Sequence, residues 1–204
     1  MTVRPLTQGL QARSRDTNER LVATATRLFA DRGVDDVTVD EICAAAGVAK
    51  GTFYFHFLAK EDLLVAMFFR GGEDTAAEID AMVAAGERFA TVIDRLIMRT
   101  AAGARRLPRQ LVVAAVREVL SRIGQGPMHP TTKAARNGAL DALIAQAQRR
   151  GEVSSSFTAA EIRMAINWAL MQGLLVWAAP EVTMPLEQAL RRSVAMLVDG
   201  VGVR

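Results

Sequence analysis

The sequence contains very few of the residues from which disulfides, metal sites and most catalytic centres are built. Its 204 residues include one cysteine, Cys43, and two histidines, His56 and His129. A single cysteine excludes a disulfide within the chain and any metal site made of several cysteines. We find no glycine-rich phosphate loop, no nucleophile elbow and no metal-binding spacing of His, Cys and carboxylate residues. The sequence therefore predicts a protein that is not an enzyme and that holds no metal or cofactor.

Long hydrophobic runs are also missing. No stretch reaches about 18 uninterrupted apolar residues, which a membrane-spanning helix would need, and the N-terminus lacks the apolar core of a signal peptide. We therefore expect a cytoplasmic protein with no membrane partner. Half of the residues are nevertheless hydrophobic, only 5% are aromatic, and alanine is abundant. This composition predicts a packed all-α protein with one large or two small domains.

The charge of the chain is compatible with nucleic-acid binding but is unevenly distributed. The net charge is +3, and residues 1–15 contain Arg4, Arg13 and Arg15 without any acid. Residues 16–60, by contrast, contain more acidic than basic residues. Because residues 1–15 contain a proline and a glycine and lack apolar periodicity, we expect a flexible basic arm there, either solvated or bound to phosphate.

The most informative segment is TVDEICAAAGVAKGTFYFHF, at residues 38–57. Thr38, followed three residues later by Glu41, forms the capping-box pattern that starts a helix. Gly47 supplies the conformational freedom for a tight turn, and a second, shorter helix is expected to begin near Lys50. The order of helix, tight turn and short helix predicts a helix-turn-helix.

This segment resembles the DNA-binding domain of TetR-family transcriptional regulators. The matching residues are Thr38, Ile42, Cys43, Ala46, Gly47, Val48, Gly51, Thr52, Tyr54, His56, Phe57, Lys60 and Leu63. A further helix is expected before it, from Asp16 at the N-cap to Asp31, and with this helix the resemblance covers about residues 16–65. Ala49 and Phe55 depart from the family pattern, which usually has Ser at the first position and a polar or Tyr side chain at the second. The resemblance implies a helix-turn-helix domain at 16–60 and a helical ligand-binding and dimerisation domain at 61–204. The apolar pattern and the breaks along the chain indicate about nine helices in all.

The resemblance also implies a DNA-binding site. We predict that it consists of Thr38, Lys50, Gly51, Thr52, Tyr54, Phe55, His56 and Lys60. We expect Lys50 and Thr52 to reach base edges, and Phe55 to pack on a thymine methyl group. Tyr54 and His56 are expected at backbone phosphates. Thr38 and Lys60 are expected near helix N-termini, where the helix dipole favours anions, and Gly51 lets the backbone approach DNA closely.

Apolar periodicity predicts further helices after Lys60. Gly71 and Gly72 interrupt the first of them and indicate a kink or a break. The helix expected at 158–179 has two apolar stripes, and the helix expected at 185–200 has one. The stripes of the first helix are Ile162, Ile166, Ala169, Gly173 and Trp177, and Met164, Trp168, Met171 and Leu175.

In the family, the last two helices form the dimer interface and a small molecule binds among the C-terminal helices. By that resemblance we predict a dimer interface that contains Ile162, Ile166, Gly173, Trp177, Leu186, Leu190, Val194 and Leu197. The predicted ligand-binding residues are Ile97, Met98, Val116, Leu120, Met164, Trp168 and Met171. Ordinary core packing within one chain explains the dimer set almost as well. For the ligand set it is the commoner explanation of a Met and Trp stripe, so this alternative stays open for both.

Together these features predict a homodimeric, sequence-specific DNA-binding regulator of transcription. The preferred interpretation is a repressor that a small apolar effector releases from an inverted-repeat operator in double-stranded DNA. One alternative is a ligand-independent or activating DNA binder. Another is an effector-binding or protein-interaction module that has lost DNA binding.

Overall fold

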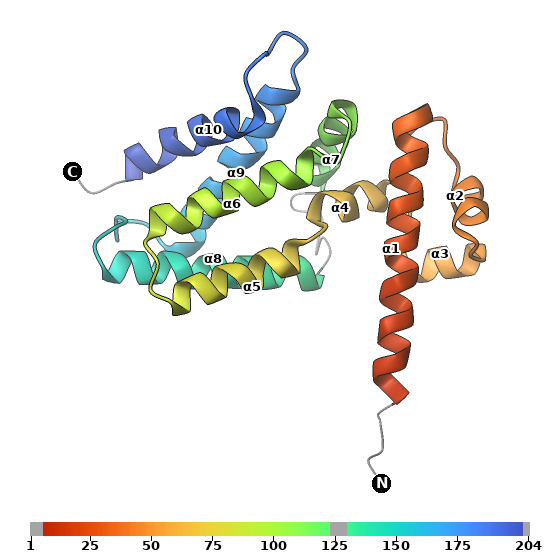
Figure 1. The fold of residues 1–204 in the computed structure, drawn as a ribbon, viewed down its shortest axis with the longest axis horizontal. Coiled ribbons are helices and arrows are strands. Elements are labelled where there is room, and N and C mark those ends of the chain that lie inside the picture. The colour runs from red at the N-terminus through yellow and green to blue at the C-terminus, as the bar shows by residue number, and fades with distance from the viewer. Residues whose placement is uncertain (1–5, 123–129, 202–204) are drawn as a thin grey trace. The chain divides into compact units, whose positions relative to one another are not determined.

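The computed structural model describes residues 6–122 and 130–201, and within them the side chains of residues 13–122 and 137–197. All regular structure in the described ranges is helical and consists of ten α-helices, which confirms the all-α prediction. In these ranges no helix is sufficiently long and apolar to cross a membrane. The chain divides into two compact units, with the boundary along the sequence between Met67 and Phe68. Figure 1 labels the helices of both units. The predicted loop at 124–130, including His129, lies outside the described residues apart from Pro130.

The first unit is built on α1 (Leu6–Arg32), α2 (Val39–Ala46) and α3 (Lys50–His56). The helix α1 begins ten residues before the start that we predicted at Asp16, and its N-terminal half runs past α3 in Figure 1. The prediction of a flexible arm is therefore wrong for residues 6–15. Leucine, glutamine and arginine each occur twice in this segment, and these residues favour helices even without an apolar stripe. Arg4 lies outside the described residues.

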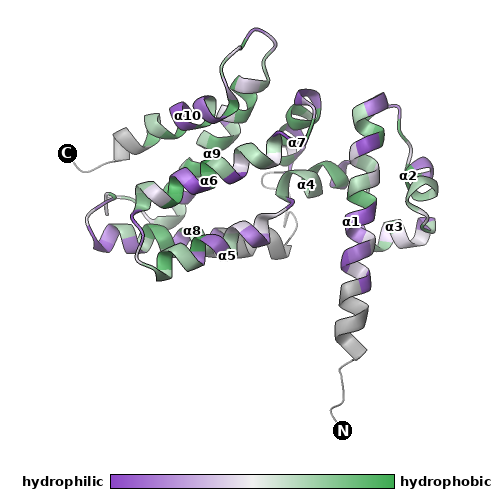
Figure 2. Cartoon of the chain, viewed as in Figure 1, coloured by the Kyte–Doolittle hydropathy of each residue, from purple (hydrophilic) through white to green (hydrophobic). Residues whose placement is uncertain are grey.

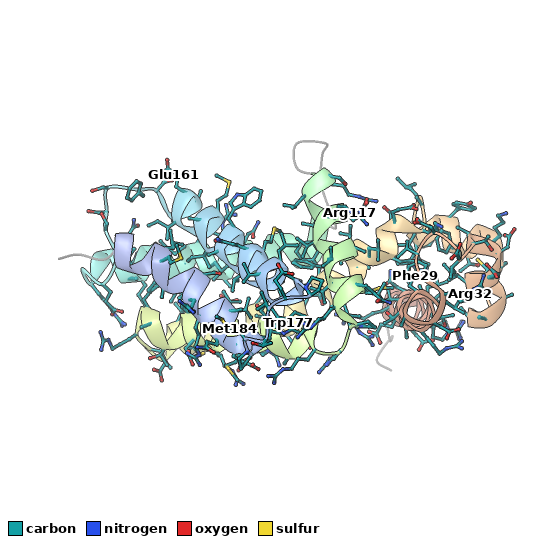
Figure 3. The ribbon with its side chains drawn as sticks, turned by 90° about the horizontal axis from the view of Figure 1, so that it is seen from above. Phe29, Arg32, Arg117, Glu161, Trp177 and Met184 are labelled. Atoms are coloured by element: carbon teal, nitrogen blue, oxygen red, sulfur yellow. The ribbon has the colours of Figure 1, made fainter. Side chains whose placement is uncertain are left out.

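The core of the first unit is made of side chains that recur on one face of each helix. Phe29, which Figure 3 labels on α1, is fully buried, as are Ile42 on α2 and Phe53 on α3. The other buried residues of these elements are Leu21, Val22, Ala25, Val37, Cys43 and Phe57. Val37 precedes the first residue of the α2 cap and is buried with Ile42, as expected for a hydrophobic staple.

The helix that we expected to run on from Lys60 is broken into α4 (Glu61–Phe69) and α5 (Gly72–Ala84). Gly71 lies at the break with a φ of +79°, in the left-handed region that only glycine adopts without cost. The predicted interruption is therefore confirmed and raises the helix count of the described residues from nine to ten. Figure 2 shows that α4 is hydrophobic along most of its length, and residues 63–67 are all buried.

The second unit is a helical bundle that begins with α5. Its other helices are α6 (Phe89–Ala104), α7 (Arg109–Ser121), α8 (Pro130–Arg149), α9 (Ala159–Ala178) and α10 (Leu186–Val201). The helix α5 packs along α8, α9 packs along α10, and α6 contacts all four of them (Figure 1). A continuous apolar core lies between these helices, and it includes Leu96, Val116, Leu140, Ile166 and Leu190.

The helices α9 and α10 approach each other closely at Gly173. A Cβ atom on Gly173 would lie 2.9 Å from the Cα atom of Leu190 and 2.9 Å from its Cδ2 atom. The backbone of α10 occupies the space that any larger residue would need, so the glycine sets the distance and the rotation between the two helices.

We predict that Gly173→Ala lowers the free energy of unfolding by about 1–3 kcal/mol, because the added methyl group forces the two helices apart. The matched control is Gly138→Ala on α8, where an added Cβ has no neighbour within 4 Å. This control should raise the free energy of unfolding by up to about 1 kcal/mol through helix propensity. Urea denaturation of both variants measures the difference, and equal effects would contradict the close crossing.

Candidate nucleic-acid interface

The helices α2 and α3 form the predicted helix-turn-helix. Gly47 ends α2 in the left-handed conformation, with a φ of 64°, and the amide of Val48 donates to the carbonyl of Cys43 at 3.0 Å. Ala49 is the N-cap of α3 and provides no side-chain hydrogen bond, as expected for a residue without a hydroxyl. Phe53 and Phe57 are buried with ring centroids 5.7 Å apart, so they hold α3 against the core by one face.

The start of α2 is fixed by a capping box that also binds α1. The Glu41 carboxylate accepts from the backbone amide of Thr38 at 2.8 Å, and the Glu41 amide donates to the Thr38 hydroxyl at 3.3 Å. Arg32, at the end of α1, donates to Glu41 at 2.6 Å and to the carbonyl of Asp36 at 2.5 Å. The Arg32 side chain, together with the two Thr38 donors, lowers the pKa of Glu41 to about 2. The predicted capping role of Thr38 is confirmed, and its hydroxyl proton is directed to Glu41.

Lys60 binds the loop that joins α1 to α2. Its Nζ atom donates to the carbonyls of Val34, Asp35 and Val37, at 2.7, 3.1 and 3.0 Å. An ammonium group has three N–H donors, so these contacts account for all of them. The donors that a phosphate contact would need are therefore already engaged. Instead of the phosphate contact that we predicted, Lys60 forms a clamp, by which we mean its three hydrogen bonds to the loop.

Lys50, the first residue of α3, is paired with Asp40 in the first turn of α2. The Nζ atom lies 2.8 Å from one carboxylate oxygen of Asp40 and 3.1 Å from the other. Both side chains are more than half exposed. The hydrogen bond and the charge of Asp40 raise the pKa of Lys50. The residue that we predicted at base edges thus lies on the surface but has an anionic partner.

The outward face of α3 is mostly apolar. Tyr54 is 47% exposed, Phe55 is 79% exposed, and Leu58, just after the helix, is 86% exposed. Gly51 is exposed and Thr52 is partly exposed, in agreement with their predicted place on the surface. His56 is partly buried, which lowers its pKa, so its neutral form, with one N–H donor, is favoured near neutral pH.

The structure thus places most of the predicted DNA-binding residues on and around α3. Three further residues, which we did not predict, belong to the same site. Leu58 extends the exposed apolar face, while Arg32 and Asp40 set the positions of Glu41 and Lys50. Asp40 could have been found, because it is the acid of the first helical turn next to the capping glutamate. Among the described side chains, no group of three or more His, Cys, Asp or Glu residues is placed to bind a metal.

In the second unit, the residues predicted at the dimer interface lie inside the chain's own core. The buried ones are Ile162, Ile166, Gly173, Leu186, Leu190 and Val194, and the partly buried ones that pack on this core are Trp177 and Leu197. Arg109 stacks over the ring of Trp177 at 4.8 Å; Figure 3 labels this tryptophan near the end of α9. The prediction is wrong for the six buried residues, because the apolar stripe that contains Gly173 faces α10 of the same chain, and it stays a prediction for the partly exposed Trp177 and Leu197.

The other stripe of α9 faces outward. Met164 is 55% exposed, Trp168 is 47% exposed and Leu175 is also exposed; we call these three residues the outer stripe. Met164 and Trp168 were predicted in a ligand pocket together with Met98 on α6, which is exposed as well. The structure therefore places Met98, Met164 and Trp168 on the surface of the chain and not in an enclosed pocket. The remaining predicted ligand-binding residues, which lie in or against the core, are Ile97, Val116, Leu120 and Met171.

Comparison with known proteins identifies relatives of this chain. A family described as "Bacterial regulatory proteins, tetR family" matches residues 21–67. The HTH-type transcriptional repressor BepR of Brucella suis is 30% identical over 179 residues, which cover 76% of this chain and 79% of BepR. The uncharacterized HTH-type transcriptional regulator YerO of Bacillus subtilis is 44% identical over 50 residues, but the match covers only 24% of this chain and 17% of YerO.

One solved structure extends the similarity through both units. It is the Thermus thermophilus FadR, a TetR-family transcriptional repressor in complex with lauroyl-CoA. The two structures have a TM-score of 0.67 and 25% sequence identity, over 92% of this chain and 96% of that chain. BepR, YerO and FadR are all transcriptional regulators, and the similarity to FadR covers the bundle as well as the helix-turn-helix.

The clamp predicts that Lys60 contributes to the stability of the fold and not to phosphate binding. Lys60→Met keeps the length of the side chain but removes all three donors, so it should lower the free energy of unfolding by about 1–3 kcal/mol. The salt dependence of DNA binding should not change, because no phosphate contact is lost. Arg27→Met is the control. Arg27 is an exposed cation of α1 and forms no ion pair with another described residue. Unchanged stability with a flatter salt dependence would contradict the clamp and restore the phosphate contact.

Proposed function

Because the chain belongs to the TetR family of bacterial regulatory proteins, we propose that it is a transcriptional repressor that binds an inverted-repeat operator as a homodimer. The observation that carries this proposal is the exposure of α3. Two phenylalanines anchor the helix by one face, and its opposite face offers Thr52, Tyr54 and Phe55 to solvent. The Phe55 ring contacts the edge of His56 but leaves most of its apolar surface in water, whereas a major groove offers that surface an apolar partner.

In the proposed complex, α3 lies in the major groove with its first residues at the base edges. Thr52 donates to a base and Phe55 packs on a thymine methyl group. Gly51, which is exposed and has open space around its Cα atom, allows the backbone to approach the DNA. Tyr54 and His56 donate to phosphates, and Thr38 lies at the N-terminus of α2, where a phosphate is also favoured.

We infer that the homodimer forms through the outer stripe of α9. Met164, Trp168 and Leu175 lie four and seven residues apart and so share one side of the helix. Met196 on α10 is a further exposed apolar residue on the neighbouring helix. Apolar residues that gather in this way on a surface are typical of protein interfaces, and a two-fold dimer would bury the same residues of both copies.

We propose that a small apolar molecule releases the repressor. FadR of Thermus thermophilus, which resembles this chain through both units, was solved with lauroyl-CoA, so a long-chain acyl-CoA is the first compound to test. Of the predicted ligand-binding residues, Ile97, Val116, Leu120 and Met171 remain candidates for the lining, because they belong to the interior of the bundle. Their aliphatic and thioether side chains suit an acyl chain.

The proposal predicts specific, salt-dependent binding to DNA with two-fold symmetry. A duplex selected by the protein from a random pool should contain an inverted repeat, with half-site centres about 34–36 Å apart or a multiple of that distance. The logarithm of the binding constant should fall linearly with the logarithm of salt concentration. Fluorescence anisotropy with the selected duplex, with and without lauroyl-CoA, measures binding and release. Selection of asymmetric single sites would reject the dimeric complex, and equal affinity for a shuffled duplex would reject the function.

The outer stripe predicts the effect of one surface substitution. Trp168→Asp would place an unpaired charge in the proposed interface, so the dimer dissociation constant should rise roughly 30-fold or more. Met98→Asp on α6 is the control, because it introduces the same charge at another exposed apolar residue that lies outside the outer stripe. Analytical ultracentrifugation gives the dissociation constants, and circular dichroism tests the fold. A Trp168→Asp variant that dimerises like the wild type would show that the interface lies elsewhere.

A further inference from the structure

We propose that Asp40 determines how selectively the protein binds DNA, by competing with phosphate groups for Lys50. This inference rests on the proposed DNA-binding function and assigns to an acidic residue a role in the same site. It begins from an unexpected feature of α3: the basic residue at its start faces a carboxylate on α2, although the surface around it is the one proposed to meet a polyanion.

The pair between Asp40 and Lys50 is not explained by the fold. The N-terminus of α2 is already capped by Thr38 and Glu41, so it does not need the Asp40 carboxylate. Both members of the pair are well exposed, and an isolated ion pair on a surface contributes little to stability. The dipole of α2 favours an acid in its first turn, which explains the carboxylate but not its contact with the first residue of α3.

The geometry of the pair has two consequences for DNA. First, the Asp40 carboxylate compensates the charge of Lys50, so Lys50 attracts phosphates less strongly and releases fewer counterions on random DNA. Second, Asp40 holds the ammonium group through two oxygen atoms, 2.8 and 3.1 Å away. Because an ammonium group has three N–H donors, at least one of them is not used by these two contacts. A correctly placed base acceptor, such as guanine O6 or N7, can use that donor without breaking the pair.

A phosphate, which binds chiefly by charge, must instead compete with Asp40 for Lys50. Matched DNA therefore keeps its contact with Lys50, while non-specific DNA loses part of it. The carboxylate also repels phosphates directly. Asp40 thus lowers the affinity for random sequences more than the affinity for the operator, and the ratio of the two affinities rises.

The experiment compares the wild type with Asp40→Asn, which keeps the shape of the side chain and removes its charge. The probes are the inverted-repeat duplex selected by the wild type and a shuffled duplex of the same composition. For the shuffled duplex, we expect binding about 5–10-fold tighter at low salt and a salt slope steeper by about 0.9, the value for one more phosphate contact. For the selected duplex, we expect a change of less than about two-fold. Asp31→Asn, which removes the same charge at the end of α1, is the control and should leave the affinity ratio unchanged.

A double-mutant cycle tests whether Asp40 acts through Lys50. In a Lys50→Ala background, Asp40→Asn should tighten binding to the shuffled duplex no more than Asp31→Asn does. An equal effect of Asp40→Asn with and without Lys50 would overturn the proposal, since only general charge repulsion would then remain. An unchanged affinity ratio in the single variant, with an unchanged thermal midpoint, would also overturn it. If the wild type itself did not prefer the selected duplex, the proposed function would fail instead, so the two failures are distinguishable.

Discussion

The geometry of the helix-turn-helix depends on how the loop between α1 and α2 satisfies its backbone. Four successive carbonyls, at residues 34–37, accept hydrogen bonds from two cationic side chains: Lys60 binds three of them and Arg32 binds that of Asp36. The loop's own backbone provides one further contact to these acceptors, from the Val37 amide to the Val34 carbonyl at 3.5 Å, so the two side chains provide most of the hydrogen bonds that order the loop. Because Arg32 also binds the capping carboxylate of Glu41, the same contacts set where α2 begins relative to α1. The position of α3 follows through the tight turn at Gly47.

This arrangement compensates much of the positive charge within the helix-turn-helix itself. Three of the basic residues in the helix-turn-helix, Arg32, Lys50 and Lys60, are engaged by carboxylates or carbonyls of the same unit. A domain of this kind cannot bind DNA tightly through charge alone. Apolar contacts and directional hydrogen bonds must therefore supply a large share of the binding energy, and these are the contacts that distinguish one base sequence from another. The exposed Phe55 and Leu58 are consistent with that balance.

The sequence predicted local features well, because their signals lie within a few residues of one another. The capping box at Thr38, the turn at Gly47 and the break at Gly71 were all placed correctly. Contacts between distant residues could not be predicted in the same way. Lys60 and Val34 are 26 residues apart in the sequence. That separation does not show whether the lysine binds the loop or a phosphate group. The start of α1 was missed for a different reason, since residues 6–15 favour a helix by propensity without an apolar stripe.

The two stripes of α9 show most clearly what periodicity leaves open. Both have the spacing of a buried helix face, so hydrophobic pattern alone cannot tell which one faces the core. Which stripe faces the core is decided by the close approach of α9 to α10, which the hydrophobic pattern does not encode. The stripe that contains Gly173 can come within contact distance of the Leu190 backbone. No stripe of large side chains can do so, and Met164 and Trp168 are consequently turned outward. The smallest residue of the helix therefore determines, through packing within one chain, which large residues are available to a second one.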